Sequence, residues 1–376
     1  MKITMICDVL GEANNGTTLA ALNLIAHLRG KGHQLTVVSP DAYRTEAGFV
    51  AVPELNLGFL LNKVLQKNGV HLAKPDKRIL EQAIRGADVV HLLTPFPLAI
   101  AGLKIARRLG IPVTASFHCQ AENVTAHLGL MNFRPANALT YRIFYKKVYR
   151  YCTAVHYPTD FIRGVFEKSV KHKTPAYVIS NGVNNMFVPD PNAVRDPDAP
   201  FTIVCCGRYS KEKAQYQLIR ALSHSRYADK IRVVFAGTGP WEKYLRFLAK
   251  RKGIAAQFSF FAREDLVKIL QTADLYVHTA LVEIEAIACT EAICCGLIPV
   301  ICDSPRSATR LFAIGDHSLF RMLDPKNLCE MIEYWYENPG KKRQRSEEYE
   351  ALRKKFAQRE CMERMEQMLY EAAKRA

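Results

Sequence analysis

The sequence predicts an α/β protein made of two doubly wound, parallel-sheet domains. Short apolar runs alternate with amphipathic segments of roughly 10–15 residues, which is the pattern of βαβ units. The pattern stops at a segment rich in proline and aspartate and then starts again. The 376 residues also exceed the roughly 250–300 residues at which single hydrophobic cores stop growing.

The first half contains the strands and helices of one βαβ series. An amphipathic helix is expected at Leu19–Leu28, between the first two strands. The charged, amphipathic tail from Ser346 to Ala376 has a helical pattern and can cross back onto this half. The expected strands of the first half are Ile3–Cys7, Leu35–Val38, Val89–Leu92, Pro112–Phe117 and Ala154–Tyr157.

A second series follows the segment Pro189–Pro200, whose proline and aspartate content predicts a linker. We expect domains at 1–185 and 186–357, with a C-terminal helix at about 358–376 that returns to the first domain. Ligands of such sheets bind outside the carboxyl ends of the strands, here in a cleft between the two halves. The expected strands of the second half are Phe201–Cys206, Ile231–Gly237, Phe258–Phe261, Leu275–His278 and Ile298–Cys302.

Charge and cysteine content restrict the partners and the compartment. The chain has 52 Lys and Arg against 36 Asp and Glu, a net charge of +16, which favours anionic partners such as nucleotides, nucleic acid or an acidic membrane surface. Its 11 cysteines include no C-x-x-C spacing, which predicts a reduced, cytosolic protein without disulfides or a zinc site. The N-terminus does not have the pattern of a secretory signal. Without an apolar run of about 18 residues, any membrane contact is expected to be peripheral.

Two glutamates bracket an apolar segment in the second half. The stretch E-I-E-A-I-A-C-T-E places Glu283 and Glu291 eight positions apart, and A-I-C-C-G-L-I-P-V-I-C follows. Carboxylates on a buried, apolar helix are costly unless each finds hydrogen-bond donors. Sugar and ribose hydroxyls are such donors. The alternative is a solvated helix face whose spacing arises by chance.

Several motifs, taken together and in order, resemble a known family. They are Ser180–Pro189 with N-G-V, then C-G-R-Y-S-K-E-K, F-A-G-T-G-P and the Glu-x7-Glu stretch. This series is similar to the retaining, GT-B-fold glycosyltransferases, a large family that includes sucrose synthase and bacterial mannosyl- and glucosyltransferases. The resemblance covers nearly the whole chain. It implies two Rossmann-like domains that face each other across a cleft.

The resemblance assigns the phosphate-binding cations to the loop after the first strand of the second half. Arg208 and Lys213 would bind the donor diphosphate and stabilise the leaving group as the sugar bond breaks. The alternative interpretation makes both residues solvated surface cations.

The resemblance also assigns the two glutamates. Glu283 would accept hydrogen bonds from the donor sugar, and Glu291 from the ribose. Backbone N–H groups near Ile287 and Ala288, at the start of a helix, would hold the diphosphate. The family usually has glycine one and three positions after the first glutamate, where this chain has Ile284 and Ala286. That departure leaves the identity of the sugar open.

In the first half, G-E-A-N-N-G-T-T follows the first strand, and Gly16 best matches the family's glycine-rich loop near the donor phosphates. His118 matches a family histidine that contacts the donor sugar near the reacting carbon; without the resemblance, a lone histidine favours a structural role. Glu122 and Asn123 would face the acceptor side. His91 is interpreted as a structural residue at a strand end.

No divalent metal is expected to be required. Asp196–Asp198 has the spacing of a metal-binding D-x-D, but it lies in the proline-rich linker, where aspartate and proline are typical of turns. Arg208, Lys213 and a helix N-terminus could supply the positive charge instead.

Two stretches combine apolar residues with cations in the manner of interfacial helices, residues 55–74 and 128–151. In the second stretch, Lys146, Lys147 and Arg150 are the candidate contacts to an anionic membrane. An ordinary amphipathic helix packed on its own sheet would have the same composition.

The strings F-H-C-Q-A-E-N and D-S-P-R-S-A-T are similar to those of bacterial diacylglycerol glucosyltransferases. This finer resemblance implies an enzyme at the cytosolic membrane face that transfers glucose from UDP-glucose to the 3-hydroxyl of diacylglycerol. Three alternatives stay open. They are the same chemistry on a soluble or glycan acceptor, a nucleotide-sugar epimerase, and a basic nucleic-acid-binding protein, although no nucleic-acid module is recognised and no nucleic-acid partner is expected.

Overall fold

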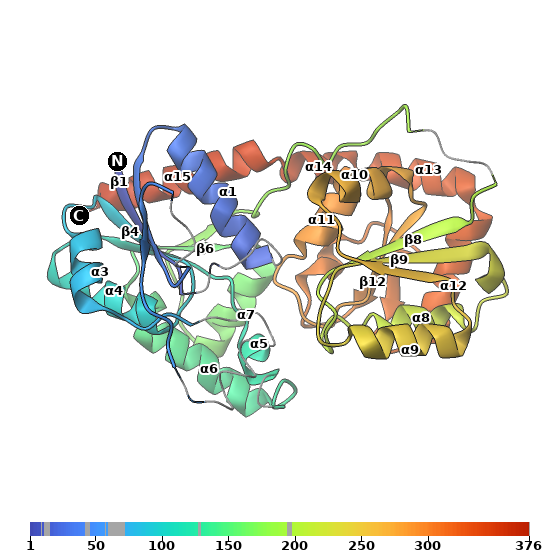
Figure 1. Cartoon of the computed structure of the whole chain (residues 1–376), viewed down its shortest axis with the longest axis horizontal. Coiled ribbons are helices and arrows are strands. Elements are labelled where there is room, and N and C mark those ends of the chain that lie inside the picture. The colour runs from blue at the N-terminus through green and yellow to red at the C-terminus, as the bar shows by residue number, and fades with distance from the viewer. Residues whose placement is uncertain are drawn as a thin grey trace. The chain divides into compact units, whose positions relative to one another are not determined.

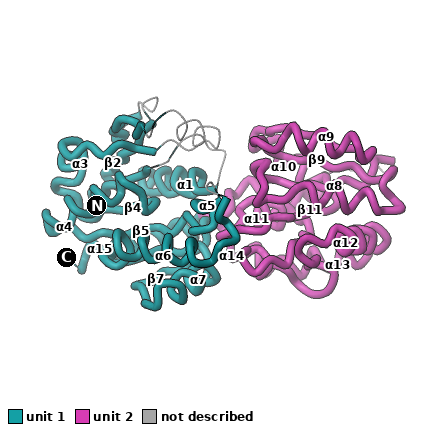
Figure 2. Tube along the Cα trace, turned by 90° about the horizontal axis from the view of Figure 1, so that it is seen from below, with its two compact units in different colours: residues 1–181, 359–376 teal, residues 182–358 magenta. Residues whose placement is uncertain are grey.

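The computed structural model describes residues 1–8, 10, 16–41, 46–56, 58, 72–126, 129–193 and 198–375. The chain divides into two compact units (Figure 2). Unit 1 comprises Met1–Asn181 and Arg359–Ala376, and unit 2 comprises Gly182–Gln358. The division between the units thus falls within a few residues of the domain boundary that the sequence predicts, and the C-terminal segment is grouped with unit 1.

Unit 1 contains a seven-stranded parallel sheet with the order β3-β2-β1-β4-β5-β6-β7. The order reverses beside β1, which pairs with β2 on one side and with β4 on the other. The sequence predicted the five central strands but neither edge strand. The strands are β1 Lys2–Ile6, β2 Gln34–Ser39, β3 Phe49–Ala51, β4 Val89–Leu92, β5 Val113–Ser116, β6 Ala154–Tyr157 and β7 Ala176–Val178.

The helices of unit 1 connect these strands (Figure 1). They are α1 Gly16–Gly30, α3 Lys77–Ile84, α4 Pro97–Arg108, α5 Ala121–Ala126, α6 Arg134–Lys147, the short 3-10 turn η1 Tyr149–Tyr151 and α7 Asp160–Val170. The predicted helix at Leu19–Leu28 lies within α1. The candidate interfacial stretch 55–74 lies mostly outside the described residues.

Helix α15, Gln358–Ala373, packs against α1 in unit 1 (Figure 1). Its buried face, which includes Met365 and Leu369, joins the core cluster formed by β1, β2 and α1. Glu366 accepts from His27 Nε2 at 2.9 Å and from His33 Nε2 at 2.8 Å, which fixes the rotation of the helix. The end of the chain therefore completes the core of unit 1.

Unit 2 contains a six-stranded parallel sheet with the order β10-β9-β8-β11-β12-β13. Two doubly wound parallel sheets confirm the predicted α/β fold class. The strands are β8 Phe201–Cys206, β9 Ile231–Ala236, β10 Ala256–Ser259, β11 Leu275–His278, β12 Pro299–Asp303 and β13 Leu319–Arg321.

Helices cover both faces of this second sheet. In Figure 1, α8 and α9 lie on one face, and α10 and α11 on the other. The helices and 3-10 turns of unit 2 are α8 Tyr216–Leu222, η2 Ala228–Lys230, α9 Glu242–Lys252, α10 Arg263–Thr272, α11 Ile287–Cys294, η3 Ala308–Phe312, α12 Pro325–Glu337, α13 Pro339–Glu348 and α14 Glu350–Lys355.

All 11 cysteines are buried and free of disulfide bonds. None of the helices in the described ranges has the length and hydropathy that a membrane span requires.

Candidate functional site

The predicted donor-binding residues of unit 2 gather at one point of its sheet. The strand order reverses between β8 and β11, which pair side by side. Arg208 and Lys213 lie in the loop after β8, Glu283 lies in the loop after β11, and Glu291 lies in the following helix α11. Open α/β sheets bind ligands at such a reversal, outside the carboxyl ends of the strands.

Close backbone approach fixes the two loops that follow β8 and β9. A Cβ at Gly237 would lie 2.2 Å from the Gly207 oxygen, and one at Gly239 would lie 2.5 Å from the Tyr209 oxygen. The backbone N–H of Tyr209 donates to Thr238 O at 2.8 Å across this contact. The glycine turn in F-A-G-T-G-P thus has a steric role, because any side chain would push the Arg208 loop away.

Glu283 lies between two basic side chains. It forms an ion pair with Lys213, and its Oε1 lies 3.5 Å from Nε2 of His278, the last residue of β11. Burial alone would raise the pKa of Glu283, but Lys213 and His278 outweigh burial and hold that pKa at about 2. The carboxylate is therefore ionised at neutral pH although little of it is exposed.

Hydrogen bonds also join the two loops that carry this ion pair. Thr279 Oγ1 donates to Lys213 O at 2.7 Å, and the N–H of Leu281 donates to Glu212 O at 2.8 Å. Ser304 Oγ donates to Leu281 O at 2.6 Å from the loop after β12. The loops after three neighbouring strands therefore form one connected structure.

Arg208 and Lys213 do not face solvent as isolated cations, as one alternative from the sequence required. Arg208 Nη2 lies 2.9 Å from Glu212 Oε1, and Lys213 pairs with Glu283. The sequence treated these cations and Glu283 as separate contacts to the donor. In the structure Lys213 and Glu283 also contact each other directly, which the sequence did not predict.

Glu291 is buried inside α11 and pairs with Arg263, the first residue of α10, at 2.7 Å. Burial raises the pKa of Glu291, and Arg263 partly offsets this effect. Arg263 also lies over the ring of Phe187, 4.8 Å from its centre. Analysis of the sequence alone missed both Arg263 and His278. Their positions beside strand ends were the available signal.

Helix α11 begins after an unusual backbone conformation. Ala286 has φ 66° and ψ 67°, a left-handed conformation that a Cβ disfavours. The related family has glycine at this position, so the structure explains that preference. Ile287 and Ala288, predicted to offer backbone N–H groups to a diphosphate, occupy the first turn of α11 and are half-buried.

In unit 1, Gly16 is the exposed first residue of α1, and most of the loop before it lies outside the described residues. His118 is half-buried, two residues beyond β5. Burial and the nearby His156 and His91 hold its pKa well below the ordinary value, so its imidazole is neutral. The rings of His118 and His156 lie 5.6 Å apart.

A buried polar chain lies behind His118. His91 Nδ1 lies 2.9 Å from Thr114 Oγ1, and its Nε2 lies 3.0 Å from Ser116 Oγ. Ser116 Oγ is also 2.9 Å from His156 Nδ1. The structural role predicted for His91 agrees with these contacts, since it cross-links β4 and β5.

The two predicted acceptor-side residues differ in their surroundings. Asn123 is exposed in α5, whereas Glu122 is buried and its Oε2 accepts from the hydroxyl of Tyr141 at 2.8 Å. One oxygen of Glu122 is therefore engaged inside unit 1, between α5 and α6. Lys146, Lys147 and Arg150 are exposed at the end of α6 and in η1, as a surface role requires.

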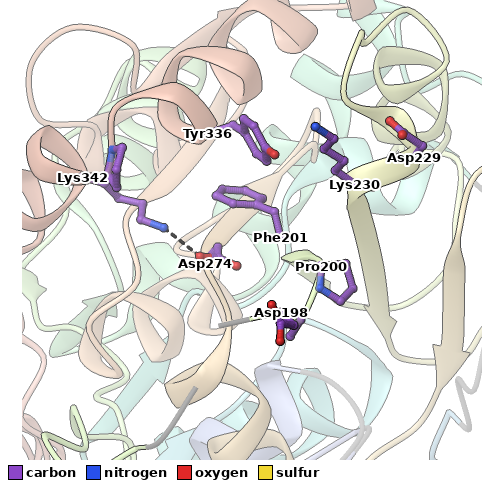
Figure 3. Close-up of a pocket in the computed structure, with 10 residues that line it drawn as sticks. Asp198, Pro200, Phe201, Asp229, Lys230, Asp274, Tyr336 and Lys342 are labelled. Atoms are coloured by element: carbon purple, nitrogen blue, oxygen red, sulfur yellow. Dashed lines mark hydrogen bonds and ion pairs between the residues drawn. The ribbon is translucent and has the colours of Figure 1, made fainter. Parts of the chain in front are cut away.

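A pocket of about 560 Å³ lies elsewhere in unit 2 (Figure 3). Its lining includes Phe201 at the start of β8, Tyr336, and the ion pair between Lys342 and Asp274 at 2.8 Å. Because Phe201 begins its strand and Asp274 precedes β11, this pocket lies at the amino ends of the strands. It contains none of the predicted donor-binding residues.

Metal binding was expected to be unnecessary. Asp196 lies outside the described residues, so the D-P-D sequence has no structural account. Among the residues that are described, no group of three or more His, Cys, Asp or Glu side chains is arranged to hold a metal ion. Metal independence stays a prediction.

Comparison with known proteins assigns the family. Two Rossmann-like sheets with a charged cluster at a strand reversal define an enzyme of the GT-B class. The model of Glycosyltransferase Family 4 matches residues 14–185, and that of Glycosyl transferases group 1 matches residues 171–353. The chain therefore contains a Glycosyltransferase Family 4 domain followed by a Glycosyl transferases group 1 domain, as the motifs indicated.

Full-length relatives are distant. An alpha-monoglucosyldiacylglycerol synthase of Acholeplasma laidlawii is 21% identical, with 80% of each chain aligned. A GDP-mannose-dependent alpha-mannosyltransferase of Corynebacterium glutamicum is 24% identical over 88% of this chain and 79% of the relative. The corresponding mannosyltransferase of Mycolicibacterium smegmatis is 29% identical, but the chain spans only 36% of its length.

Solved structures share the GT-B fold. Anabaena Alr3699/HepE in complex with UDP and glucose aligns with a TM-score of 0.76 and 16% identity over 98% of this chain and 99% of that one. Sucrose-phosphate synthase of Thermosynechococcus elongatus aligns over both whole chains with a TM-score of 0.77 and 14% identity. The catalytic domain of cholesterol-alpha-glucosyltransferase from Helicobacter pylori is 46% identical over 40% of this chain and 95% of that one, with a TM-score of 0.39.

The left-handed conformation of Ala286 predicts that Ala286→Gly stabilises unit 2. Glycine removes a steric cost of about 1 kcal/mol at this backbone position. Ala288→Gly, two positions later and inside α11, should instead destabilise by about 1 kcal/mol, because glycine is unfavourable in a helix. Urea unfolding of both variants measures the difference. Equal destabilisation by the two substitutions would contradict a strained Ala286.

The low pKa of Glu283 predicts how stability depends on pH. A carboxylate whose pKa lies below its ordinary value stabilises the folded state at neutral pH, and this contribution is lost as pH falls from about 4.5 towards 2. Relative to Glu283→Gln, the wild type should lose roughly 2 kcal/mol of unfolding free energy between pH 6 and pH 3. Denaturant unfolding of the two proteins at each pH measures this difference. If the unfolding free energies of both proteins changed equally with pH, the low pKa of Glu283 would be refuted.

Proposed function

We propose that this protein is a retaining hexosyltransferase that transfers glucose from UDP-glucose to the 3-hydroxyl of diacylglycerol. The observation that carries the proposal is the cluster of Lys213, Glu283 and His278 at the strand reversal of unit 2. It combines an ionised acceptor for sugar hydroxyls with a cation for phosphate, where α/β sheets bind nucleotides.

The donor diphosphate would bind beside Arg208 and Lys213, with the N–H groups of Ile287 and Ala288 at the start of α11 as further donors. These groups stabilise the negative charge that develops on the departing diphosphate. Positive charge from the protein chain makes a divalent ion unnecessary in this proposal. In unit 1, Gly16 would be the residue near the donor phosphates.

Glu283 would accept hydrogen bonds from the hydroxyls of the donor sugar, and Glu291 from those of the ribose. Donor hydroxyls would then share each carboxylate with a cation that already orients it, Lys213 or Arg263. His118, held neutral, would donate or accept a hydrogen bond near the reacting carbon. Glu122 and Asn123 would lie on the acceptor side.

The anomeric carbon of the sugar retains its configuration if the acceptor oxygen attacks from the same face that the diphosphate leaves. The acceptor hydroxyl forms the new bond to the sugar carbon while the bond to the diphosphate breaks. The departing diphosphate oxygen takes the acceptor's proton. The residues of this chain position both partners and stabilise charge, so no separate base is needed.

A lipid acceptor is supported by relatives named alpha-monoglucosyldiacylglycerol synthase and by one exposed face of unit 1. Along α6, Leu139, Arg142, Ile143 and Lys146 recur at helical spacing and all are exposed. Leu139 is 57% exposed and Ile143 is 47% exposed. Apolar side chains interleaved with cations suit an anionic bilayer, and in this proposal the enzyme would bind peripherally at the inner face of the membrane.

Transfer assays test this function directly. Purified protein is given UDP-, GDP- and ADP-hexoses, with EDTA, in detergent micelles containing diacylglycerol, a sterol or a soluble oligosaccharide. We expect a glucosylated diacylglycerol from UDP-glucose alone, and a loss of turnover of about a hundredfold or more in Arg208→Ala, which removes charge from the leaving group. Product from GDP-mannose, a soluble acceptor or no acceptor would replace this function with the corresponding alternative.

The exposed face of α6 gives a separate prediction. Lys146→Ser, Lys147→Ser and Arg150→Ser together should weaken binding to phosphatidylglycerol vesicles by tenfold or more, since each cation near such a surface contributes about 1 kcal/mol. Sedimentation measures the binding. The control replaces three exposed cations at α3, Lys77, Arg78 and Arg85, and removes the same charge. If both triple variants weakened vesicle binding equally, the vesicles would be attracted to the positive charge of the whole protein and not to a defined surface on α6.

A further inference from the structure

Helix α9 of unit 2 presents an exposed face of aromatic and cationic side chains. Lys243, Tyr244, Phe247, Lys250 and Arg251 are all exposed and recur at the three- and four-residue spacing of a single helix face. Phe247 is 59% exposed and Tyr244 is 39% exposed. This face, called the α9 face below, contributes two large apolar side chains to the protein surface.

The α9 face is not part of the buried core of unit 2. The opposite side of the helix, Leu245, Leu248 and Ala249, is buried and anchors α9 in the unit. Arg246 pairs with Glu242 at 2.9 Å and donates to Phe258 O at 2.8 Å. The orientation of α9 is therefore already fixed, and Phe247 and Tyr244 are available for an external contact.

The charge of the α9 face is strongly positive. Within the described part of the chain, the Glu242–Arg246 ion pair is the one pair that α9 makes. Lys243, Lys250 and Arg251 add three positive charges without a carboxylate in ion-pair contact in the same described residues. The acidic residues Glu264 and Asp265 belong to α10, on the other face of the sheet (Figure 1).

Aromatic rings continue from the α9 face onto α8. The Trp241 ring lies 5.2 Å from that of Tyr244 and 6.1 Å from that of Tyr216, and Arg220 lies over Tyr216 at 5.0 Å. Tryptophan and tyrosine favour the boundary between water and lipid, because one end of the ring is apolar and the other forms hydrogen bonds.

We infer that the α9 face is a second membrane-docking surface, which binds an anionic lipid bilayer independently of α6. Phe247 and Tyr244 would enter the region of the acyl boundary, while Lys243, Lys250 and Arg251 contact anionic headgroups. The inference rests on the proposed lipid-linked function but concerns unit 2, to which that function assigned only the donor. A convex helix face fits a bilayer better than single-stranded nucleic acid, which binds along grooves.

Intrinsic fluorescence can test the α9 face in the whole protein. The chain has two tryptophans, and Trp335 is 1% exposed and donates to His317 O. Trp241 precedes α9 and is half-buried. Vesicles of phosphatidylglycerol with brominated acyl chains, added without sugar nucleotide, should quench Trp241, and Trp241→Phe should abolish that response.

The decisive variant combines Phe247→Ser, Lys250→Ser and Arg251→Ser. It should weaken vesicle binding by about tenfold or more and remove the quenching. Its control, Lys268→Ser with Lys354→Ser on α10 and α14, removes the same charge from exposed positions on the other face and should leave both measurements unchanged. Circular dichroism and transfer to micellar acceptor check that the variant folds and retains its chemistry.

Other results would overturn the inference. Vesicle binding without quenching would assign docking to unit 1 alone, and no vesicle binding would exclude a membrane role for the α9 face. Quenching by a single-stranded oligonucleotide but not by vesicles would assign the face to nucleic acid. The micellar assay separates these outcomes from the proposed function, because transfer to diacylglycerol in detergent does not depend on docking to a bilayer.

Discussion

Two carboxylates of unit 2, the half-buried Glu283 and the buried Glu291, constrain the loops around them. A carboxylate removed from water is unfavourable unless charged or hydrogen-bonding partners replace the water. Lys213 is that partner for Glu283, and Arg263 is that partner for Glu291. Because the members of each pair come from different loops or helices, meeting this requirement also positions the loops after β8, β10 and β11. The same ion pairs therefore compensate the carboxylates and hold the loops in position.

The two glutamates are not equivalent. Glu283 has a lowered pKa because Lys213 and His278 outweigh burial, whereas Glu291 has a raised pKa because burial outweighs Arg263. Glu283 is suited to remain an anionic hydrogen-bond acceptor at all physiological pH values. A donor that binds Glu283 through its hydroxyls would meet a carboxylate whose orientation is already fixed, so little reorganisation would be needed.

The sequence predicted the parts of the fold that depend on local patterns. Central strands such as β1 and β8 are nearly continuous apolar runs, because both faces of a parallel sheet are covered. The edge strands β3, β7 and β13 have three residues each and are partly exposed, so no apolar run identified them. The glutamate spacing and the glycine turn were likewise visible in the sequence.

Ion pairs between residues that lie far apart in the sequence could not be predicted from local patterns. Lys213 and Glu283 are 70 positions apart, and Arg263 and Glu291 are 28 positions apart. Each residue alone resembles an ordinary charged side chain. Only the sheet order, which places β8 beside β11, brings the first pair together. Ala286 shows the same limit, because a left-handed backbone conformation cannot be inferred from an alanine.

The two surfaces with exposed apolar and cationic side chains bear on how such an enzyme would meet its substrates. In the proposed function a sugar nucleotide is supplied from water and a diacylglycerol from the bilayer, so the enzyme would have to reach the membrane without being embedded in it. Attraction between exposed cations and anionic headgroups is screened within about 8 Å at physiological ionic strength, which makes the association reversible. Partly exposed Leu139, Ile143 and Phe247 would add apolar contact without the length of a membrane span. Cationic faces of this kind account for the basic composition of the chain more directly than the donor site does, because the site's own cations are paired with glutamates.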